Sequence, residues 1–237
     1  MSVLILSWGV CFAKDIIPEK EVNALLFSPF ENFQGLIDVI SNKVDTTIDL
    51  MEVIRMELTG ENSVITPEGV FIIGTYDENG TPNAMNAAWG QQSGQGEITF
   101  FLGKHKTTEN IKKTNAFTVA MATKETVLIS DYFGVETGKN VNKIEKAGVH
   151  VHKSSHVNAP IIEEYPMTLE CEVKSWDDEA GVLVGRIVAS QVDDSIITDG
   201  KVDLDKMQPI MYDASTNTYR LIGPVVGKAF SDGLKLK

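Results

Sequence analysis

Alternating apolar and polar positions predict that residues 70 to 190 form mainly β-strands. Val70 to Tyr76 is rich in β-branched and aromatic residues, and the Asn79-Gly80 pair that follows is a strong short-range signal for a hairpin turn. Pro82 to Trp89 is the predicted return strand. Two compact apolar runs, Ile98 to Leu102 and Phe117 to Met121, have the length of further strands.

A second hairpin is predicted near the end of this region. Met167 to Lys174 alternates apolar and charged residues, as a half-buried strand does. The turn-forming residues of Asp177 to Gly181 follow, and Val182 to Ala189 is the expected partner strand.

Short helices are predicted between these strands. They run from Thr107, as the N-cap, to Lys113, from about Lys124 to Phe133, and from Asn142 to Ala147, where Gly148 ends the last one. Strands at this spacing, with turn residues between them, favour a barrel over a doubly wound sheet. The predicted fold class is therefore mostly β with short helices (α+β).

Composition and charge narrow the range of functions. The 237 residues are 43% hydrophobic, so the chain can bury a sizeable core, and the formal net charge is −12. That charge argues against nucleic-acid binding and against anionic membrane surfaces, both of which need basic patches. No apolar run reaches the about 18 residues of a membrane span. Cys11 and Cys171 form no CxxC pair and indicate free thiols in a reducing compartment, so a cytoplasmic location is expected.

Common catalytic and metal motifs are missing from the sequence. It has no GxGxxG after a strand, no Walker loop and no GxSxG, which argues against Rossmann, P-loop and serine-hydrolase sites. His150 and His152 lie on one face of a predicted strand, and His156 follows, but no carboxylate or thiolate is obviously placed to complete a metal site. We therefore expect exposed strand histidines, no metal and no catalytic side chain.

Two segments carry the candidate chemistry. Asn83 to Trp89 follows the hairpin turn and places amides, small side chains and one large aromatic in a row, against which a flat ligand could lie. Lys104 to Ile111 combines lysines, a histidine and threonines at a predicted helix start. Free N–H groups there, with hydroxyl and ammonium groups, are typical of a phosphate site. A ring shelf near a phosphate clamp suggests flavin mononucleotide (FMN).

The order of these segments and later ones resembles the flavin reductase-like family, and within it the flavoredoxin-like branch. The resemblance covers about residues 60 to 232 and is carried by Ile72–Gly80, Asn83–Trp89, His105–Ile111, Ser130–Gly134, Ala159–Pro166, Leu169–Cys171, Gly200–Leu204 and Val226–Phe230. It implies an FMN-binding split β-barrel, a homodimer, and NAD(P)H as a co-substrate.

The resemblance also implies a set of cofactor-binding residues. Those beside the flavin ring are Asn86, Ala87, Ala88 and Trp89, and those toward the phosphate are Lys104, His105, Lys106, Thr107, Thr108 and Asn110. Trp89 could instead be an ordinary core aromatic, and Lys106 to Thr108 a solvated helix cap. His105 could contact the flavin or only orient its loop. Lys139 and Lys143 are expected to reach the flavin across the dimer interface, the alternative being solvated surface lysines.

Three functions are compatible with these residues. The first is an oxidoreductase that moves electrons between NAD(P)H, or a redox protein partner, and flavin. The second is a non-catalytic FMN-binding electron carrier, and the third is a degenerate barrel that serves only as an interaction module.

The amino terminus is predicted to be separate from this domain. Residues 1–55 form an N-terminal extension of uncertain status, and residues 56–237 form the flavin reductase-like domain. The apolar run Val3 to Ala13 has the length of a signal-peptide core, but no Lys or Arg precedes it, so secretion is not expected. Met51 and Met56 would each be an alternative start, and one or two short helices are compatible with residues 23–50.

Overall fold

The computed structural model of the protein describes residue 60 and residues 64–237. The extension over residues 1–55, its signal-like run and its expected helices lie outside the described residues. Val64 to Lys237 form one compact unit.

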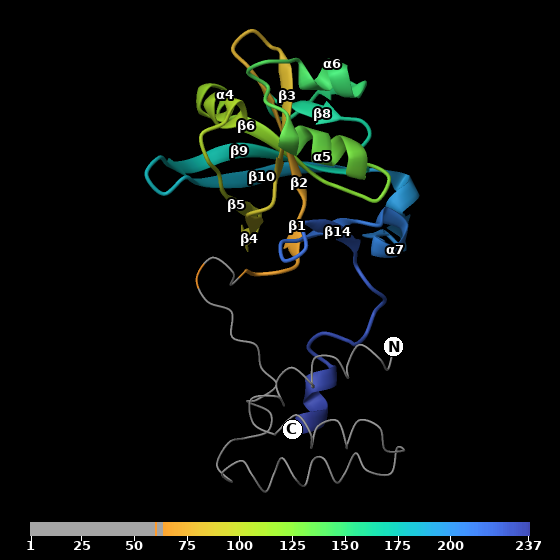
Figure 1. The fold of residues 1–237 in the computed structure, drawn as a ribbon. Coiled ribbons are helices and arrows are strands. Elements are labelled where there is room, and N and C mark those ends of the chain that lie inside the picture. The colour runs from red at the N-terminus through yellow and green to blue at the C-terminus, as the bar shows by residue number, and fades with distance from the viewer. Residues whose placement is uncertain (1–59, 61–63) are drawn as a thin grey trace, which may run out of the picture. The chain divides into compact units, whose positions relative to one another are not determined.

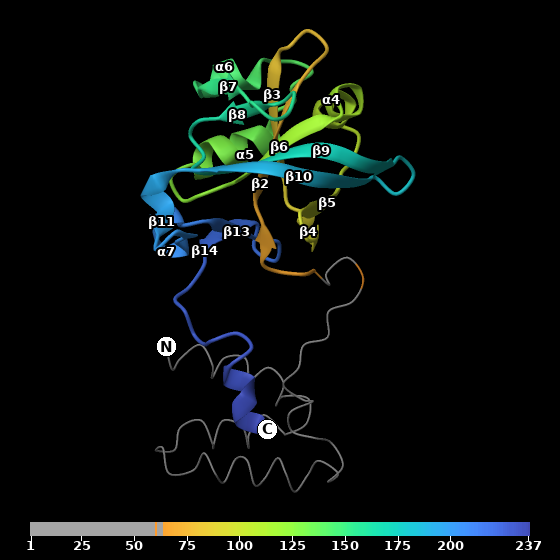
Figure 2. The same cartoon turned by 180° about the vertical axis from the view of Figure 1, so that it is seen from behind.

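The described unit contains short strands and a few short helices, shown in Figures 1 and 2. The strands are β1 (Glu68–Gly69), β2 (Phe71–Tyr76), β3 (Pro82–Ala87), β4 (Gly90–Gly94), β5 (Glu97–Phe101), β6 (Ala116–Met121), β7 (Val151–Lys153), β8 (Pro160–Ile162), β9 (Met167–Asp177), β10 (Val182–Val192), β11 (Ile197–Thr198), β12 (Lys201–Val202), β13 (Ile210–Asp213) and β14 (Thr218–Leu221). The α-helices are α4 (Lys106–Thr114), α5 (Val127–Val135), α6 (Lys143–Ala147) and α7 (Leu204–Met207), and the 3-10 helices are η3 (Asp194–Ile196) and η4 (Asp232–Leu236).

The main sheet is antiparallel and curls back on itself. Its seven strands follow the order β3-β2-β6-β9-β10-β5-β4, so β3 and β4 are its two edges. Only Ala88 and Trp89 separate these strands in the sequence, and they allow no more than about 11 Å between Ala87 and Gly90. Since the first and last strands must therefore lie close together at that link, the sheet is a curled, incompletely closed barrel.

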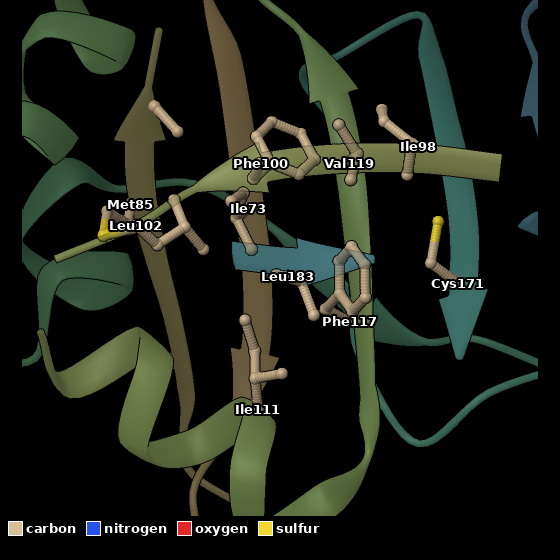
Figure 3. Packing of buried hydrophobic residues seen from close by; sticks show 11 residues of the cluster. Ile73, Met85, Ile98, Phe100, Leu102, Ile111, Phe117, Val119, Cys171 and Leu183 are labelled. Carbon is tan, nitrogen blue, oxygen red and sulfur yellow. The ribbon is translucent and has the colours of Figure 1, made fainter. Parts of the chain in front are cut away.

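Apolar side chains on the two faces of this sheet form two separate cores. On β2 the neighbouring residues Ile73 and Ile72 point to opposite faces, as the strand period requires. Ile73 belongs to the cluster enclosed by the sheet, which contains Phe100, Phe117 and Leu183 (Figure 3). Ile72 belongs to the second cluster, beneath helices α5 and α6. The mostly β class with short helices is confirmed.

Both predicted hairpins are present. β2 and β3 pair from Phe71 opposite Ala87 to Tyr76 opposite Pro82, and the Asp77 carboxylate accepts the turn N–H groups of Asn79 and Thr81 at 2.9 Å each. β9 and β10 are longer than their alternating stretches predicted.

The structure corrects several element boundaries and adds one strand to the main sheet, besides short strands outside it. The predicted strand to Trp89 ends at Ala87, and β4 follows, whose sequence GQQSG has no strand pattern. Helix α5 begins at Val127 instead of near Lys124. Helix α6 is capped by Asn142 and Gly148 as predicted.

The N-cap of helix α4 is His105 and not Thr107. The Thr108 hydroxyl accepts the His105 backbone N–H at 2.9 Å, which fixes the helix start two residues earlier than predicted. Thr107 consequently lies inside the first turn and is buried.

Candidate functional site

Helix α4 is fastened to the β2–β3 hairpin by two buried polar contacts. The Asn83 side-chain amide donates to the Thr107 hydroxyl at 2.8 Å, and the Asn110 amide donates to the Thr75 hydroxyl at 3.1 Å. All four side chains are buried. In this structure Thr107 and Asn110 therefore hold the helix on the sheet, because removing either would leave a buried amide or hydroxyl unsatisfied.

The loop before α6 lies against the start of α4 within the same chain. A Cβ at Gly138 would come 2.1 Å from the Asn83 side-chain oxygen, so only glycine allows this close approach. Lys139 next to it forms an ion pair with Glu109 of α4, Nζ to Oε1 2.7 Å. Lys106 is partly buried, and its ammonium lies 3.9 Å from Asp77. Lys106 and Lys139 are thus brought together at one helix terminus without a second subunit.

A cavity of about 370 Å³ lies on the neighbouring side of α4. It brings together Trp89, Lys104 and Thr108. Strands β4 and β5 separate Trp89 from the other two residues in the sequence. The Trp89 side chain is 66% exposed, so it is not a core aromatic. The volume lies within the range of about 300–1,000 Å³ of small-molecule pockets.

Sequence reasoning missed several residues of this cavity. They come from the end of β5, from α4 and from the β9–β10 turn, and comprise Phe101, Leu102, Gly103, Lys112, Trp176, Asp178, Glu179, Ala180 and Gly181. Lys112 belongs to a local run of lysines that the sequence shows. No sequence pattern links the β9–β10 turn to α4, because their proximity depends on the pairing of β10 with β5.

Strand β3 offers its backbone more than its side chains. The Asn86 amide donates to the carbonyl of Ser130 in α5 at 2.9 Å, Ala87 is buried in the enclosed core, and Ala88 is partly buried. In the described part of the chain only β2 pairs with β3. The outer edge of β3 therefore has N–H and C=O groups that no second strand of the described unit pairs. His105 is exposed at the start of α4.

Lys143 is buried and caps the end of helix α5. Its ammonium donates to the carbonyls of Phe133 at 3.0 Å and Glu136 at 3.1 Å. Burial lowers the pKa of Lys143 to about 8, although the nearby Glu136 charge opposes that shift. It is neither a solvated surface lysine nor, within this chain, a side chain pointing toward the cavity.

The Lys143 shift predicts a pH dependence of stability. In the unfolded chain a lysine titrates near pH 10.4, so between pH 8 and 10.4 the unfolded state binds more protons and stability rises with pH. Urea unfolding of the wild type and of Lys143→Met at pH 7.5 and 10 should show a relative gain of about 2–3 kcal/mol for the wild type. Parallel pH profiles of the two proteins would contradict this.

Among the described residues, Cys171 and three histidines each have an explanation within the fold. Burial raises the pKa of the Cys171 thiol to about 12, so it stays protonated and unreactive. His150, His152 and His156 each place Nδ1 within 2.9–3.1 Å of a glutamate oxygen, which the sequence had not indicated. Among residues 60 and 64–237 no group of three or more potential ligands is arranged to hold a metal ion. No helix of that part is long and apolar enough to cross a membrane.

Comparison with known proteins shows the family of the chain. The model of the flavin reductase like domain matches residues 64–215. The flavoredoxin of Desulfovibrio vulgaris (Miyazaki F) has 30% sequence identity and a TM-score of 0.72, covering 76% of this chain and 100% of that chain. Flavoredoxin from Methanosarcina acetivorans has 25% identity and a TM-score of 0.70, covering 77% and 100%.

A curated relative is an uncharacterized protein of Aquifex aeolicus (strain VF5). It is 31% identical over 134 residues, which are 55% of this chain and 64% of that relative. The match therefore spans less than two thirds of that relative's length.

The chain belongs to the flavin reductase-like family, whose domain matches most of the described residues. Within this family it lies on the flavoredoxin branch, and the split-barrel fold that the resemblance implied is confirmed.

Proposed function

We propose that the protein is an FMN-binding oxidoreductase that moves electrons between flavin and NAD(P)H or a redox protein partner. The observation that carries this proposal is the cavity in which Trp89, Lys104 and Thr108 meet. An aromatic side chain, a cation and a helix start around one cavity match the ring and phosphate of a flavin mononucleotide.

The residues present fit this cofactor in three ways. The open edge of β3 offers backbone groups to the polar edge of the ring, and Trp89 offers an aromatic surface. Lys104 and Lys106 supply positive charge near the start of α4 in a chain whose net charge is −12. His105, the N-cap, sets the direction of the helix N–H groups.

When bound, FMN would supply hydride and electron transfer, which needs no catalytic acid or base from the protein. The role of the chain is to hold and orient the ring, to anchor the phosphate, and to leave one ring face open to a nicotinamide. The exposed position of Trp89 at the cavity keeps that approach open.

An anaerobic titration tests the proposal. Purified protein loaded with FMN should show the visible flavin band, and NADH or NADPH should bleach it. Bound flavin that neither nucleotide reduces would favour the second candidate, an electron carrier, which the exposure of Trp89 at the cavity also supports because a protein partner can reach it. A protein that takes up no FMN would favour the third function, a barrel that serves only as an interaction module.

We propose a cytoplasmic homodimer. Leu128 and Val135 of α5 are 80% and 78% exposed, and they lie on the helix that packs against β3. Apolar side chains exposed to this extent on one short helix favour a protein contact, which a second copy would supply. Sedimentation equilibrium of the wild type and of Leu128→Glu distinguishes dimer from monomer.

Trp89→Ala is expected to weaken FMN binding by about two- to tenfold, because an aromatic contact contributes about 0.5–1.5 kcal/mol. The apo-protein should unfold at nearly the same denaturant concentration as the wild type, since Trp89 is largely exposed. Fluorescence titration and urea unfolding measure the two effects. A large loss of stability with unchanged FMN affinity would mean that Trp89 is a core aromatic and that the flavin ring binds elsewhere.

A chain beginning at Met56 is expected to fold and to bind FMN with the affinity of the full chain. Every candidate site residue lies after position 80, and all of them belong to the compact unit that starts at Val64. Circular dichroism and FMN titration of the shortened protein check this. If folding or binding is lost, the extension is part of the domain or of the dimer.

A further inference from the structure

The turn of the β9–β10 hairpin forms one side of the cavity that contains Trp89. In Figures 1 and 2 this turn and helix α4 lie toward the same end of the domain. The turn contributes Trp176 from the end of β9 together with Asp178 to Gly181. A second tryptophan therefore lines the same cavity as Trp89, although it lies 87 positions further along the chain.

Trp176 is held in place before any ligand binds. Its indole N–H donates to the Asp178 carboxylate at 2.8 Å, and the Lys112 ammonium lies 4.8 Å from the ring centroid. Lys112 also forms an ion pair with Asp178, which links α4 to the hairpin turn. The indole packs in addition on the enclosed core. Three contacts thus fix one ring, and a fixed ring loses little conformational entropy when a ligand stacks on it.

The turn that carries these residues is also tied to the sheet. The Leu102 N–H donates to the Gly181 carbonyl at 2.8 Å, and the Asp177 carboxylate accepts the N–H groups of Glu179 and Ala180 at 2.9 Å each. The hairpin turn is therefore not a free tip that folds away from the cavity.

The bonding of Trp176 limits what it can offer a ligand. Indole has a single N–H and no acceptor, and Asp178 already occupies that N–H. What remains toward the cavity is aromatic surface. The cations beside it are Lys104 and Lys112. The aromatic surfaces of Trp89 and Trp176 select a planar ring, and the carboxylates of Asp178 and Glu179 line the same cavity beside these lysines.

We propose that Trp176 is a second aromatic wall of the flavin pocket and that Lys112 and Asp178 are positioning residues that hold it there. This inference rests on the proposed binding of FMN. Trp89 and Trp176 then share the flavin ring, the first from the link between the edge strands β3 and β4 and the second from the end of the central strand β9.

Flavin emission gives a direct test, because an indole in contact with the excited flavin quenches it by electron transfer, whereas leucine does not. The variants are Trp89→Leu, Trp176→Leu and the double substitution, each loaded with FMN. We expect bound flavin to remain quenched in Trp89→Leu and to recover its emission only in the double variant. Trp176→Leu should also raise the FMN dissociation constant by about two- to tenfold. Full recovery in Trp89→Leu alone would overturn the proposal.

A second comparison holds even if Trp176→Leu folds poorly. Lys112→Met removes the charge that holds the indole, and Lys113→Met is the matched control, because Lys113 is a neighbouring exposed lysine whose ion pair is with Glu78. Riboflavin is the probe, since it has no phosphate for a lysine to bind. We expect weaker riboflavin binding in Lys112→Met only, while Trp89 keeps the bound flavin quenched in both variants. Identical behaviour of the two variants would overturn the positioning role. Absence of FMN binding to the wild type would instead reject the proposed function itself.

Discussion

Replacing both Lys104 and Lys106 with alanine is expected to weaken FMN binding by about ten- to a hundredfold while changing riboflavin binding little. A hydrogen bond to a charged group is worth about 1.5–3 kcal/mol, which corresponds to that range of dissociation constants. We expect the two lysines together to contribute the binding free energy of one such hydrogen bond. Lys104 is exposed and Lys106 lies near Asp77, and solvent screens both charges. Isothermal titration with FMN and with riboflavin measures the difference.

Thr107 is left unchanged in this test because its hydroxyl accepts the buried Asn83 amide. Alanine there would disturb the docking of α4 and mix a folding effect with a binding effect. Lys113→Ala is the control, since this lysine forms its ion pair with Glu78. Equal weakening of FMN and riboflavin in the double variant would place Lys104 and Lys106 away from the phosphate.

Phe117→Ala is expected to lower the free energy of unfolding by about 3–5 kcal/mol, the usual cost of removing a fully buried phenylalanine. Phe117 is 0% exposed and lies in the enclosed core (Figure 3). A Cβ at Gly185 would come 2.4 Å from its ring, so the ring fills the space above that glycine and nothing else can occupy it.

The matched control is Phe101→Ala, because Phe101 is 57% exposed. Its substitution should change stability by less than about 1 kcal/mol. Urea unfolding of the three proteins without flavin checks both expectations. A loss below about 1 kcal/mol for Phe117→Ala would mean that the core collapses around the missing ring.

The sequence predicted elements well where the pattern is local. The β2–β3 hairpin follows from an apolar run and an Asn-Gly pair, and helix α6 follows from its two caps. Strand β4 could not be predicted, because GQQSG is paired through the register of β5 and not through its own composition. The start of α4 was predicted two residues too late because Thr107 is a better N-cap type than His105, yet the Thr108 hydroxyl caps the His105 N–H and Thr107 bonds to the buried Asn83 amide.

The candidate site was predictable in its residue types but not in its geometry. Polar residues next to a helix start can face a ligand or the sheet, and sequence alone does not separate these orientations. Thr107 and Asn110 face the sheet, whereas Thr108 lines the cavity. The approach of Trp176 to α4 depends on the pairing of β10 with the distant strand β5, and Lys143 is buried because it caps the end of α5.

The two-residue link between β3 and β4 has a thermodynamic consequence. A ligand that contacts Trp89 in this link together with α4 and the β9–β10 turn binds only when folding has brought these segments together, so it has no affinity for the unfolded chain. Its binding free energy is then added to that of folding, which amounts to about 2.7 kcal/mol at a ligand concentration of 100 times the dissociation constant. The bound cofactor would thus complete the closure of the barrel. The melting temperature of the protein would then rise with the fraction of the protein that carries the cofactor.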